Sequence, residues 1–276
     1  MQASFFLVFL PLCFFLFLPL LTGAPAPRTV GTMTTPPPQS SSRDLDLGQG
    51  FRFFFEDPDW VKKILIGGVF MLLSSLIIGA IFVAGYGVHV LRRVVRGEPR
   101  PLPEWEQLGL FFNDGLRAFG LYLLHLVAVG ILPGALGCLI GLMGGGLASM
   151  SHGSRGASDA AGGLIALLIV ALYAVTFLMM MILMIYFPAA FTRFAVLDRF
   201  AAGFEVAENI AFIRRNLGRY ALALVLYLLA SFVAQVGIIA CCVGLFPASF
   251  WAFCVGAWAM GEVARRDPLL FPALSR

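Results

Sequence analysis

The segment GYGVHVLRRVVRGEPRPLPEWEQLGLFFNDGLR, residues 85–117, decides the fold, because it is strongly polar and lies between two long apolar segments. It carries five arginines and four acidic residues. No Asp, Glu, Lys or Arg occurs from Ile64 to Val88 on one side, or from Ala118 to Ser154 on the other. Residues 160–192 and 221–261 are also free of these four residue types. This pattern predicts membrane-spanning helices that are joined by polar loops.

The composition excludes a water-soluble domain. The 276 residues are 60% hydrophobic and only 12% charged, whereas a soluble domain carries about a quarter charged residues. The net charge of +4 does not indicate a nucleic-acid partner, because in a membrane protein the arginines matter through the loops that hold them. We therefore expect the lipid bilayer as the surroundings and no nucleic acid among the partners.

The predicted fold is all-α: a polytopic integral membrane helical bundle of about five transmembrane helices, with amphipathic interfacial helices. The expected spans are residues 64–88, 119–148, 164–187, 221–245 and 250–264, the last of which lengthens if it begins at Leu245. Residues 64–88 have an alternative interpretation as a re-entrant hairpin with both ends on one side of the membrane.

Polar and small residues predict the segments between the spans. Trp105, Leu108, Phe112, Leu116 and Phe119 share one helical face, which predicts an amphipathic interfacial helix before the second span. A second interfacial helix is expected around residues 200–211, and a flexible polar loop at residues 149–163.

Three regions follow from this pattern. Residues 1–50 contain an apolar run at 4–21 and a disordered tail rich in Pro, Ser and Thr. The run is a signal peptide, an extra transmembrane helix or an upstream extension from a misjudged start codon, and we favour the last, with Met33 as the start. Residues 51–264 form the helical membrane domain, and residues 265–276 a short cytoplasmic tail.

The arginines predict the orientation. Most of them lie in residues 92–117, 193–219 and 265–276, and five spans place all three regions on the same side. The positive-inside rule puts that side in the cytoplasm of a plasma membrane protein. Lys62 and Lys63 would then face outward, unless residues 64–88 form the hairpin.

No catalytic, cofactor or metal motif is present in the sequence. The five cysteines lie in apolar runs without the spacing of a metal site, and no acidic residue lies in the middle of a predicted span, which disfavours an ion-coupled transporter. We therefore expect no catalytic residue, cofactor or metal. The candidate sites are a polar interfacial or partner surface and a helix-packing seam with glycines four residues apart. The surface comprises Arg92, Arg93, Arg96, Glu98, Glu104, Trp105 and Asp114, and the seam comprises Gly137, Gly141 and Gly145. The alternative for the surface is a solvated loop whose charges neutralise one another.

Several motifs together resemble a known family. They are FEDP at 55–58 with WVKKILIGG at 60–68, Gly85-Tyr86 with LRRVVRGE at 91–98, PLPEW at 101–105 and DGL at 114–116, then NLGRY at 216–220 and CCVG at 241–244. In this combination the chain resembles the prokaryotic multi-pass membrane family called domain of unknown function 4013 (DUF4013), over about residues 50–262. The resemblance implies a membrane protein and brings no activity, cofactor or catalytic residue.

The sequence thus favours a non-enzymatic envelope scaffold or a lipid- or partner-binding module. A small-solute or lipid transporter is the second hypothesis, and a membrane-embedded enzyme the third. Other membrane proteins or further copies of the chain are possible partners.

Overall fold

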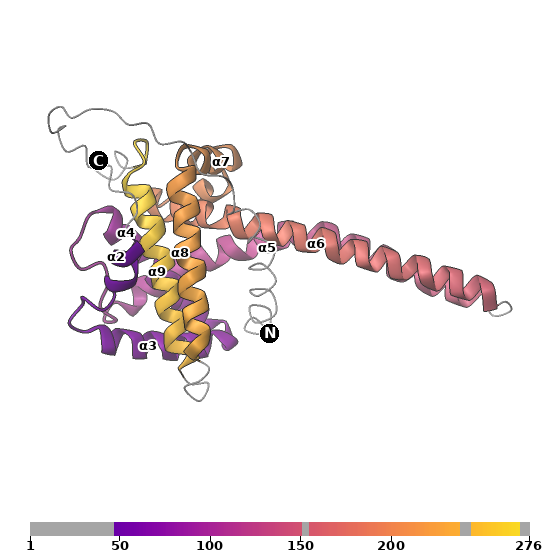
Figure 1. The fold of residues 1–276 in the computed structure, drawn as a ribbon, viewed down its shortest axis with the longest axis horizontal. Coiled ribbons are helices and arrows are strands. Elements are labelled where there is room, and N and C mark those ends of the chain that lie inside the picture. Colours follow the sequence, from indigo (N-terminus) through magenta and orange to yellow (C-terminus); the bar gives the residue numbers. More distant parts are fainter. Residues whose placement is uncertain (1–46, 151–154, 238–243, 271–276) are drawn as a thin grey trace, which may run out of the picture. The chain divides into compact units, whose positions relative to one another are not determined.

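The computed structural model describes residues 47–150, 155–237 and 244–270, and these residues form helices and no strand (Figure 1). The all-α prediction is therefore confirmed. The elements are α2 (Leu47–Arg52), α3 (Trp60–Leu72), the 3-10 turn η2 (Leu73–Leu76), α4 (Ile78–Val95), α5 (Leu108–Met150), α6 (Arg155–Leu197), the 3-10 turn η3 (Phe200–Phe204), α7 (Val206–Arg215), α8 (Leu217–Val236) and α9 (Leu245–Arg265).

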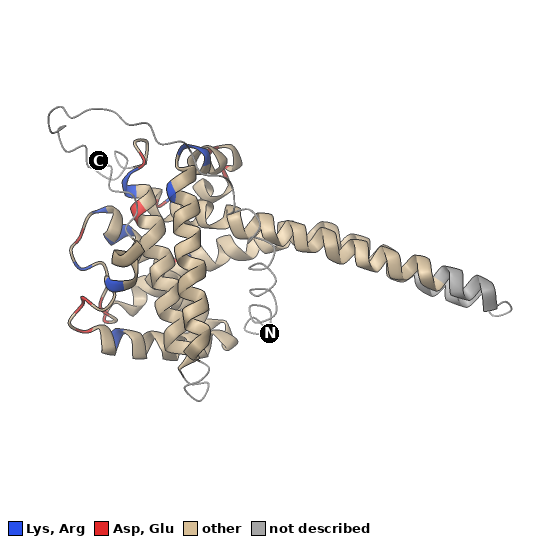
Figure 2. Cartoon of the chain, viewed as in Figure 1, with Lys and Arg blue, Asp and Glu red and all other residues tan. Residues whose placement is uncertain are grey.

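Four helices in the described part of the chain are long and apolar enough to cross a membrane. They contain residues Ile78–Val95, Leu108–Met143, Gly162–Leu197 and Leu217–Val236. Charged residues gather at the helix ends and in the loops, and the long stretches of α5, α6 and α8 between them carry none (Figure 2). In an apolar stretch of 18 residues in each of α5 and α6, only 6% of the residues are buried within the chain, whereas 61% are buried in the corresponding stretch of α4. The two helices therefore leave their apolar surface to the surroundings, as lipid-facing spans do.

The core lies where α4 packs against α9, which in turn runs beside α8 (Figure 1). Small residues make this approach possible. A Cβ added to Gly261 would lie 2.8 Å from Val94 Cβ, and one added to Gly87 would lie 2.5 Å from a ring carbon of Phe253. Because lipid is as apolar as the side chains, helix association in a membrane depends on close packing of this kind. Helix α9, which contains the last predicted span, begins at Leu245 and not at Phe250, so the longer of the two expected forms is the one observed.

The first predicted span, residues 64–88, is not one helix. Helix α3 ends at Leu72, where η2 begins, and the chain reverses direction at Ile77. The φ of Ile77 is 67°, which is unusual for a β-branched residue. The hydroxyls of Ser74 and Ser75 donate to carbonyl oxygens one turn back, those of Phe70 and Leu72, which competes with a continuing helix. The helices α3 and α4 consequently pack against each other as a hairpin.

The second correction concerns α5. The predicted interfacial helix before residue 119 and the following span are one continuous helix that begins at Leu108 and passes through Pro133. The N-terminal part of α5 crosses α4 backbone to backbone: a Cβ at Gly115 would overlap the carbonyl oxygen of Ile81, and one at Gly85 would overlap that of Phe111. This packing explains why the N-terminal part of α5 lies against α4, whereas its amphipathic pattern alone predicted a separate interfacial helix.

Several expected segments differ at their limits. The loop predicted at residues 149–163 is mostly helical, since α5 reaches Met150 and α6 begins at Arg155. The tail expected to end at Gly50 is helical from Leu47, and Gly50 packs against Trp258. The apolar run at residues 4–21 and Met33 lie outside the described residues. The second predicted interfacial helix corresponds to η3 and the short α7.

Candidate functional site

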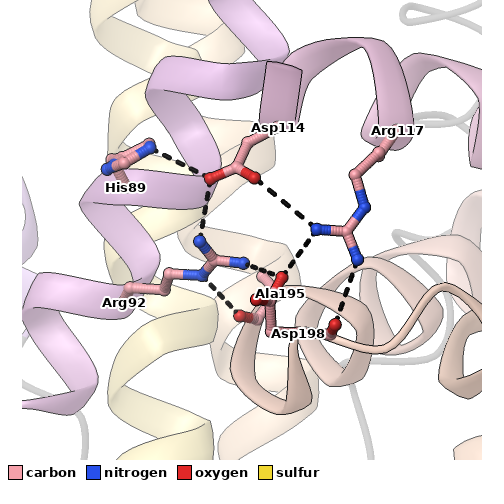
Figure 3. A network of polar contacts seen from close by, with 6 residues as sticks. All are labelled: His89, Arg92, Asp114, Arg117, Ala195 and Asp198. Atoms are coloured by element: carbon pink, nitrogen blue, oxygen red, sulfur yellow. Dashed lines mark hydrogen bonds and ion pairs between the residues drawn. The ribbon is translucent and has the colours of Figure 1, made fainter. Parts of the chain in front are cut away.

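Arg92, at the C-terminal end of α4, joins three helices (Figure 3). Its Nη1 donates to Asp114 Oδ2 on α5 at 2.8 Å. Its Nε donates to the carbonyl oxygen of Ala195 on α6 at 2.7 Å, and its Nη2 donates to Asp198 Oδ1, just beyond α6, at 2.8 Å. With a side-chain exposure of 14%, this guanidinium uses its fork of donors to fasten helix ends rather than to face solvent.

Asp198 closes the same network from the other side (Figure 3). Arg117 on α5 donates to its carboxylate at 2.8 Å and to its backbone oxygen at 3.0 Å. The φ of Asp198 is 50°, in the left-handed region that few non-glycine residues adopt. His89 Nε2 lies 3.1 Å from Asp114 Oδ2 and extends the network along α4. The contacts to the carboxylate and to the backbone oxygen of Asp198 hold this residue in the left-handed conformation.

Lys63 on α3 forms a second, more deeply buried cluster. Its Nζ lies 2.8 Å from Asp57 Oδ2 and 2.6 Å from Glu104 Oε1, and it donates to the carbonyl oxygen of Leu102 at 3.2 Å. The side chain of Lys63 is 2% exposed and that of Asp57 is 4% exposed. A charge this buried requires close partners. The ammonium of Lys63 therefore points into the protein and not towards the solvent or the lipid headgroups.

Trp105 lies before α5 and not on it, which corrects its predicted place on an amphipathic helix. Its indole stacks against Phe70, with ring centroids 4.9 Å apart, and against Tyr86, at 4.5 Å. The indole Nε1 donates to the carbonyl oxygen of Lys63 at 3.2 Å, and the hydroxyl of Tyr86 donates to that of Pro103 at 3.1 Å. The loop between α4 and α5 is thus fixed against the hairpin by buried rings whose polar atoms are satisfied.

The other predicted surface residues make looser contacts. Arg93 Nε lies 3.6 Å from Glu98 Oε2, and Arg96 Nη1 lies 3.8 Å from the other oxygen of Glu98. Exposed pairs at these distances contribute little to stability. Gly97, with a φ of 72°, ends α4 in the left-handed conformation typical of a helix C-terminus. Of the seven predicted surface residues, the structure brings Arg92 and Asp114 together in one network and places Glu104 in another.

A third cluster fastens the C-terminal part of α6 to α7. The buried Arg193 donates to Glu205 Oε2 at 2.8 Å and to Asn209 Oδ1 at 3.0 Å. Arg199 donates to the other oxygen of Glu205 at 2.5 Å. The hydrogen bond from Arg193, together with the charges of both arginines, lowers the pKa of the Glu205 carboxyl below its ordinary value.

The chain beyond α9 is tied to the start of α8. Asp267 is fully buried and accepts a hydrogen bond from Asn216 Nδ2 at 2.5 Å. Its other oxygen accepts the backbone N–H groups of Leu269 and Leu270 at 2.9 and 3.1 Å. The first residues of the predicted cytoplasmic tail are therefore part of the packed structure. Among the residues described, no group of three or more His, Cys, Asp or Glu side chains is arranged to hold a metal ion.

The comparison with known families agrees with this architecture. The family model described as "Protein of unknown function (DUF4013)" matches residues 69–243. The chain belongs to the DUF4013 family. No curated protein and no solved structure matches it. The DUF4013 match is shorter than the expected resemblance over residues 50–262. It contains Arg92, Asp114 and Asp198, while Lys63 precedes it and Asp267 follows it.

The predicted glycine seam of this DUF4013 protein lies on α5. A Cβ at Gly137 would lie 3.4 Å from Leu172 on α6, whereas one at Gly141 would meet no atom within 4 Å among the residues described. The surroundings of Gly145 lie outside the described part of the chain. The seam stays a prediction, and the close helix crossing in the structure uses Gly85 and Gly115 instead.

Sequence reasoning missed four of the central polar residues: Lys63, Asp198, Arg193 and Asp267. The sequence offered only local signals for ion pairs, in which an acid and a base lie a few residues apart. Asp57 precedes Lys63 by six residues, and Asp114 precedes Arg117 by three. The partners that matter most are distant, because 106 residues separate Arg92 from Asp198. Nothing in a single sequence pairs residues so far apart.

Proposed function

We propose that this DUF4013 protein is a non-enzymatic scaffold, or a lipid- or partner-binding module, of the cell envelope. One observation carries the proposal: the buried charged groups at the arginine-rich helix ends pair with one another. Lys63, Arg92 and Arg193 each contact one or two carboxylates and a carbonyl oxygen. Groups engaged in this way hold helices together and are not free to act on a substrate.

The orientation belongs to the same proposal. Arginines lie at or near the C-terminal ends of α4, α6, α7 and α9 and the N-terminal ends of α5 and α8, whereas the opposite end of α6 carries Arg155. By the positive-inside rule the arginine-rich ends lie in the cytoplasm of a plasma membrane protein. The spans then leave the exposed faces of α5 and α6 to lipid or to other membrane proteins, including further copies of the chain.

Reconstitution into liposomes tests the proposal against transport. We expect the purified full-length chain to give no more efflux of entrapped small solutes, and no more lipid scrambling, than empty liposomes. Native mass spectrometry of the same preparation in mild detergent should show retained lipid or a second protein chain. Solute-dependent flux would overturn the proposal in favour of a transporter, and a preparation that retains neither lipid nor protein would also contradict it.

A further inference from the structure

A small pocket opens beside the buried Lys63 cluster, between the start of α3 and the loop that follows α4. Its volume is about 150 Å³. The charged side chains around it are three acids and three bases: Asp57, Asp59, Glu104, Lys63, Arg93 and Arg100. A pocket with both signs of charge suits a ligand that also carries both.

The pocket's charges are not all engaged. Asp57 and Lys63 neutralise each other at 2.8 Å. Among the residues described, neither Arg100 nor Asp59 makes a side-chain ion pair, and both are exposed. Arg93 has only its 3.6 Å approach to Glu98 and a 3.4 Å contact to the oxygen of Leu102. Two guanidinium groups, the carboxylate of Asp59 and the outer oxygen of the half-exposed Glu104 thus remain available to a ligand.

An open apolar hollow of about 530 Å³ lies directly next to this pocket, since Pro58 and Asp59 line both. Beyond Asp59 the hollow follows α3 along Val61, Leu65 and Ile66, and the exposed Lys62 is the other charged residue that lines it. The exposed side chains of Val61, Leu65, Val69 and Leu72 continue the same line, at a spacing of four, four and three residues. A polar pocket for a headgroup therefore leads to a stripe that fits an acyl chain.

We propose that this site binds one phospholipid whose headgroup joins a phosphate to a primary ammonium, as in phosphatidylethanolamine. The phosphate contacts Arg93 and Arg100, which supply the planar donors that match phosphate oxygens. The ammonium donates to Asp59 and to the outer oxygen of Glu104, whose side chain is 47% exposed. An acyl chain follows Val61 and Leu65. This assignment deepens the lipid-binding form of the function proposed above and rests on it.

The charge pattern distinguishes this headgroup from its relatives. A quaternary ammonium has no N–H to donate to Asp59 or Glu104, and it is larger, so phosphatidylcholine should bind more weakly. A headgroup without a cation, as in phosphatidylglycerol, would leave both carboxylates facing a net negative ligand. Inorganic phosphate would lack the contacts along α3.

Native mass spectrometry with defined lipids tests the site. The full-length chain in mild detergent receives equal amounts of phosphatidylethanolamine, phosphatidylcholine and phosphatidylglycerol with the same acyl chains. We expect the ethanolamine lipid to be retained preferentially. Arg100→Gln should lower its retention about fivefold or more, since it removes a charged hydrogen-bond donor. Asp59→Asn should abolish the preference over phosphatidylcholine.

Two matched controls remove a charge elsewhere on exposed residues that also make no side-chain ion pair in the described structure. Arg214→Gln should leave the retention unchanged, and so should Glu106→Gln. Elution as a single species in size-exclusion chromatography checks that each variant folds. An equal loss in Arg100→Gln and Arg214→Gln would overturn the proposal, and so would equal binding of the three lipids or displacement of the lipid by inorganic phosphate. Such a result overturns the site alone, because the flux measurement decides the broader function separately.

Discussion

The ammonium of Lys63 lies 2.8 Å from the carboxylate of Asp57, and the two side chains are only 2% and 4% exposed. The pair lies at the start of α3, and Glu104, from the loop after α4, completes it at 2.6 Å. Both ends of the α3–α4 hairpin are therefore held at one place. A buried charge of this kind is costly without its partner, and this has consequences for both stability and topology.

The first prediction concerns the stability of the hairpin. Asp57→Asn should destabilise the protein by about 3 kcal/mol, at the lower end for a broken buried ion pair, because the buried ammonium of Lys63 loses its buried counter-charge and keeps only the half-exposed Glu104. The double variant Asp57→Asn with Lys63→Met removes both charges and should be considerably less destabilised. Denaturant titration in detergent, followed by tryptophan fluorescence, measures the difference. Asp59→Asn is the matched control, since its exposed carboxylate makes no side-chain ion pair in the described structure, and a loss as large as that of Asp57→Asn would contradict the account.

The second prediction concerns topology. Because Lys63 contacts Glu104, the residues before α3 and those after α4 should lie on the same side of the membrane. Single cysteines at Lys62 and Arg96, both exposed, are introduced into a background in which the native cysteines are replaced. A membrane-impermeant maleimide should label both from the cytoplasmic face and neither from outside. Labelling of the two positions from opposite faces would restore the single span first predicted for residues 64–88.

The sequence alone predicted the helical class and most of the long apolar helices, because the uncharged stretches at residues 118–154, 160–192 and 221–261 are longer than one span needs. It did not predict the reversal at Ile77, since the apolar run continues through it and only Ser74 and Ser75 interrupt the pattern. The re-entrant alternative had a physical motive in Lys62 and Lys63. The structure has a hairpin at these residues, and the side of the membrane on which its two ends lie stays a prediction.

The candidate site was predicted less completely. Arg92 and Asp114 were named from their charge and position, and the structure joins them. Their common partner Asp198 lies at the end of another helix, and helix-to-helix pairing depends on packing that no local pattern encodes. Trp105 was assigned to a helix face because its spacing from Leu108 and Phe112 fits one turn. Stacking on Phe70 and Tyr86 instead fixes it before α5 begins.

The third prediction concerns the crossing of α4 and α5. Gly85→Ala should destabilise the protein by about 1–3 kcal/mol or more, because the new methyl group would overlap the backbone carbonyl of Phe111. Gly115→Ala should behave in the same way against Ile81. Thermal unfolding in detergent measures the loss. Gly120→Ala is the control, because Gly120 lies on α5 like Gly115 and its added Cβ would meet no atom within 4 Å among the residues described. This variant should be neutral or stabilising.

The fourth prediction concerns pH. The hydrogen bond from Arg193, and the charges of Arg193 and Arg199, lower the pKa of Glu205 in the folded protein below its ordinary value of 4.5. A group whose pKa is lower in the folded state stabilises it above the ordinary value, and this stability is lost as the pH falls through the folded-state pKa. The wild type should therefore lose stability below about pH 4.5 partly through this group.

Glu205→Gln removes that titration. Its stability should be lower than that of the wild type at neutral pH, since the buried Arg193 loses a charged acceptor, and the difference between the two proteins should shrink as the pH falls. Thermal unfolding from neutral pH to pH 3 measures both curves. Glu208→Gln is the matched control on α7, because Glu208 makes no side-chain ion pair in the described structure. Its curve should run parallel to that of the wild type, and a Glu205→Gln curve that also stayed parallel would mean that the Arg193 contact does not set the pKa of this carboxyl.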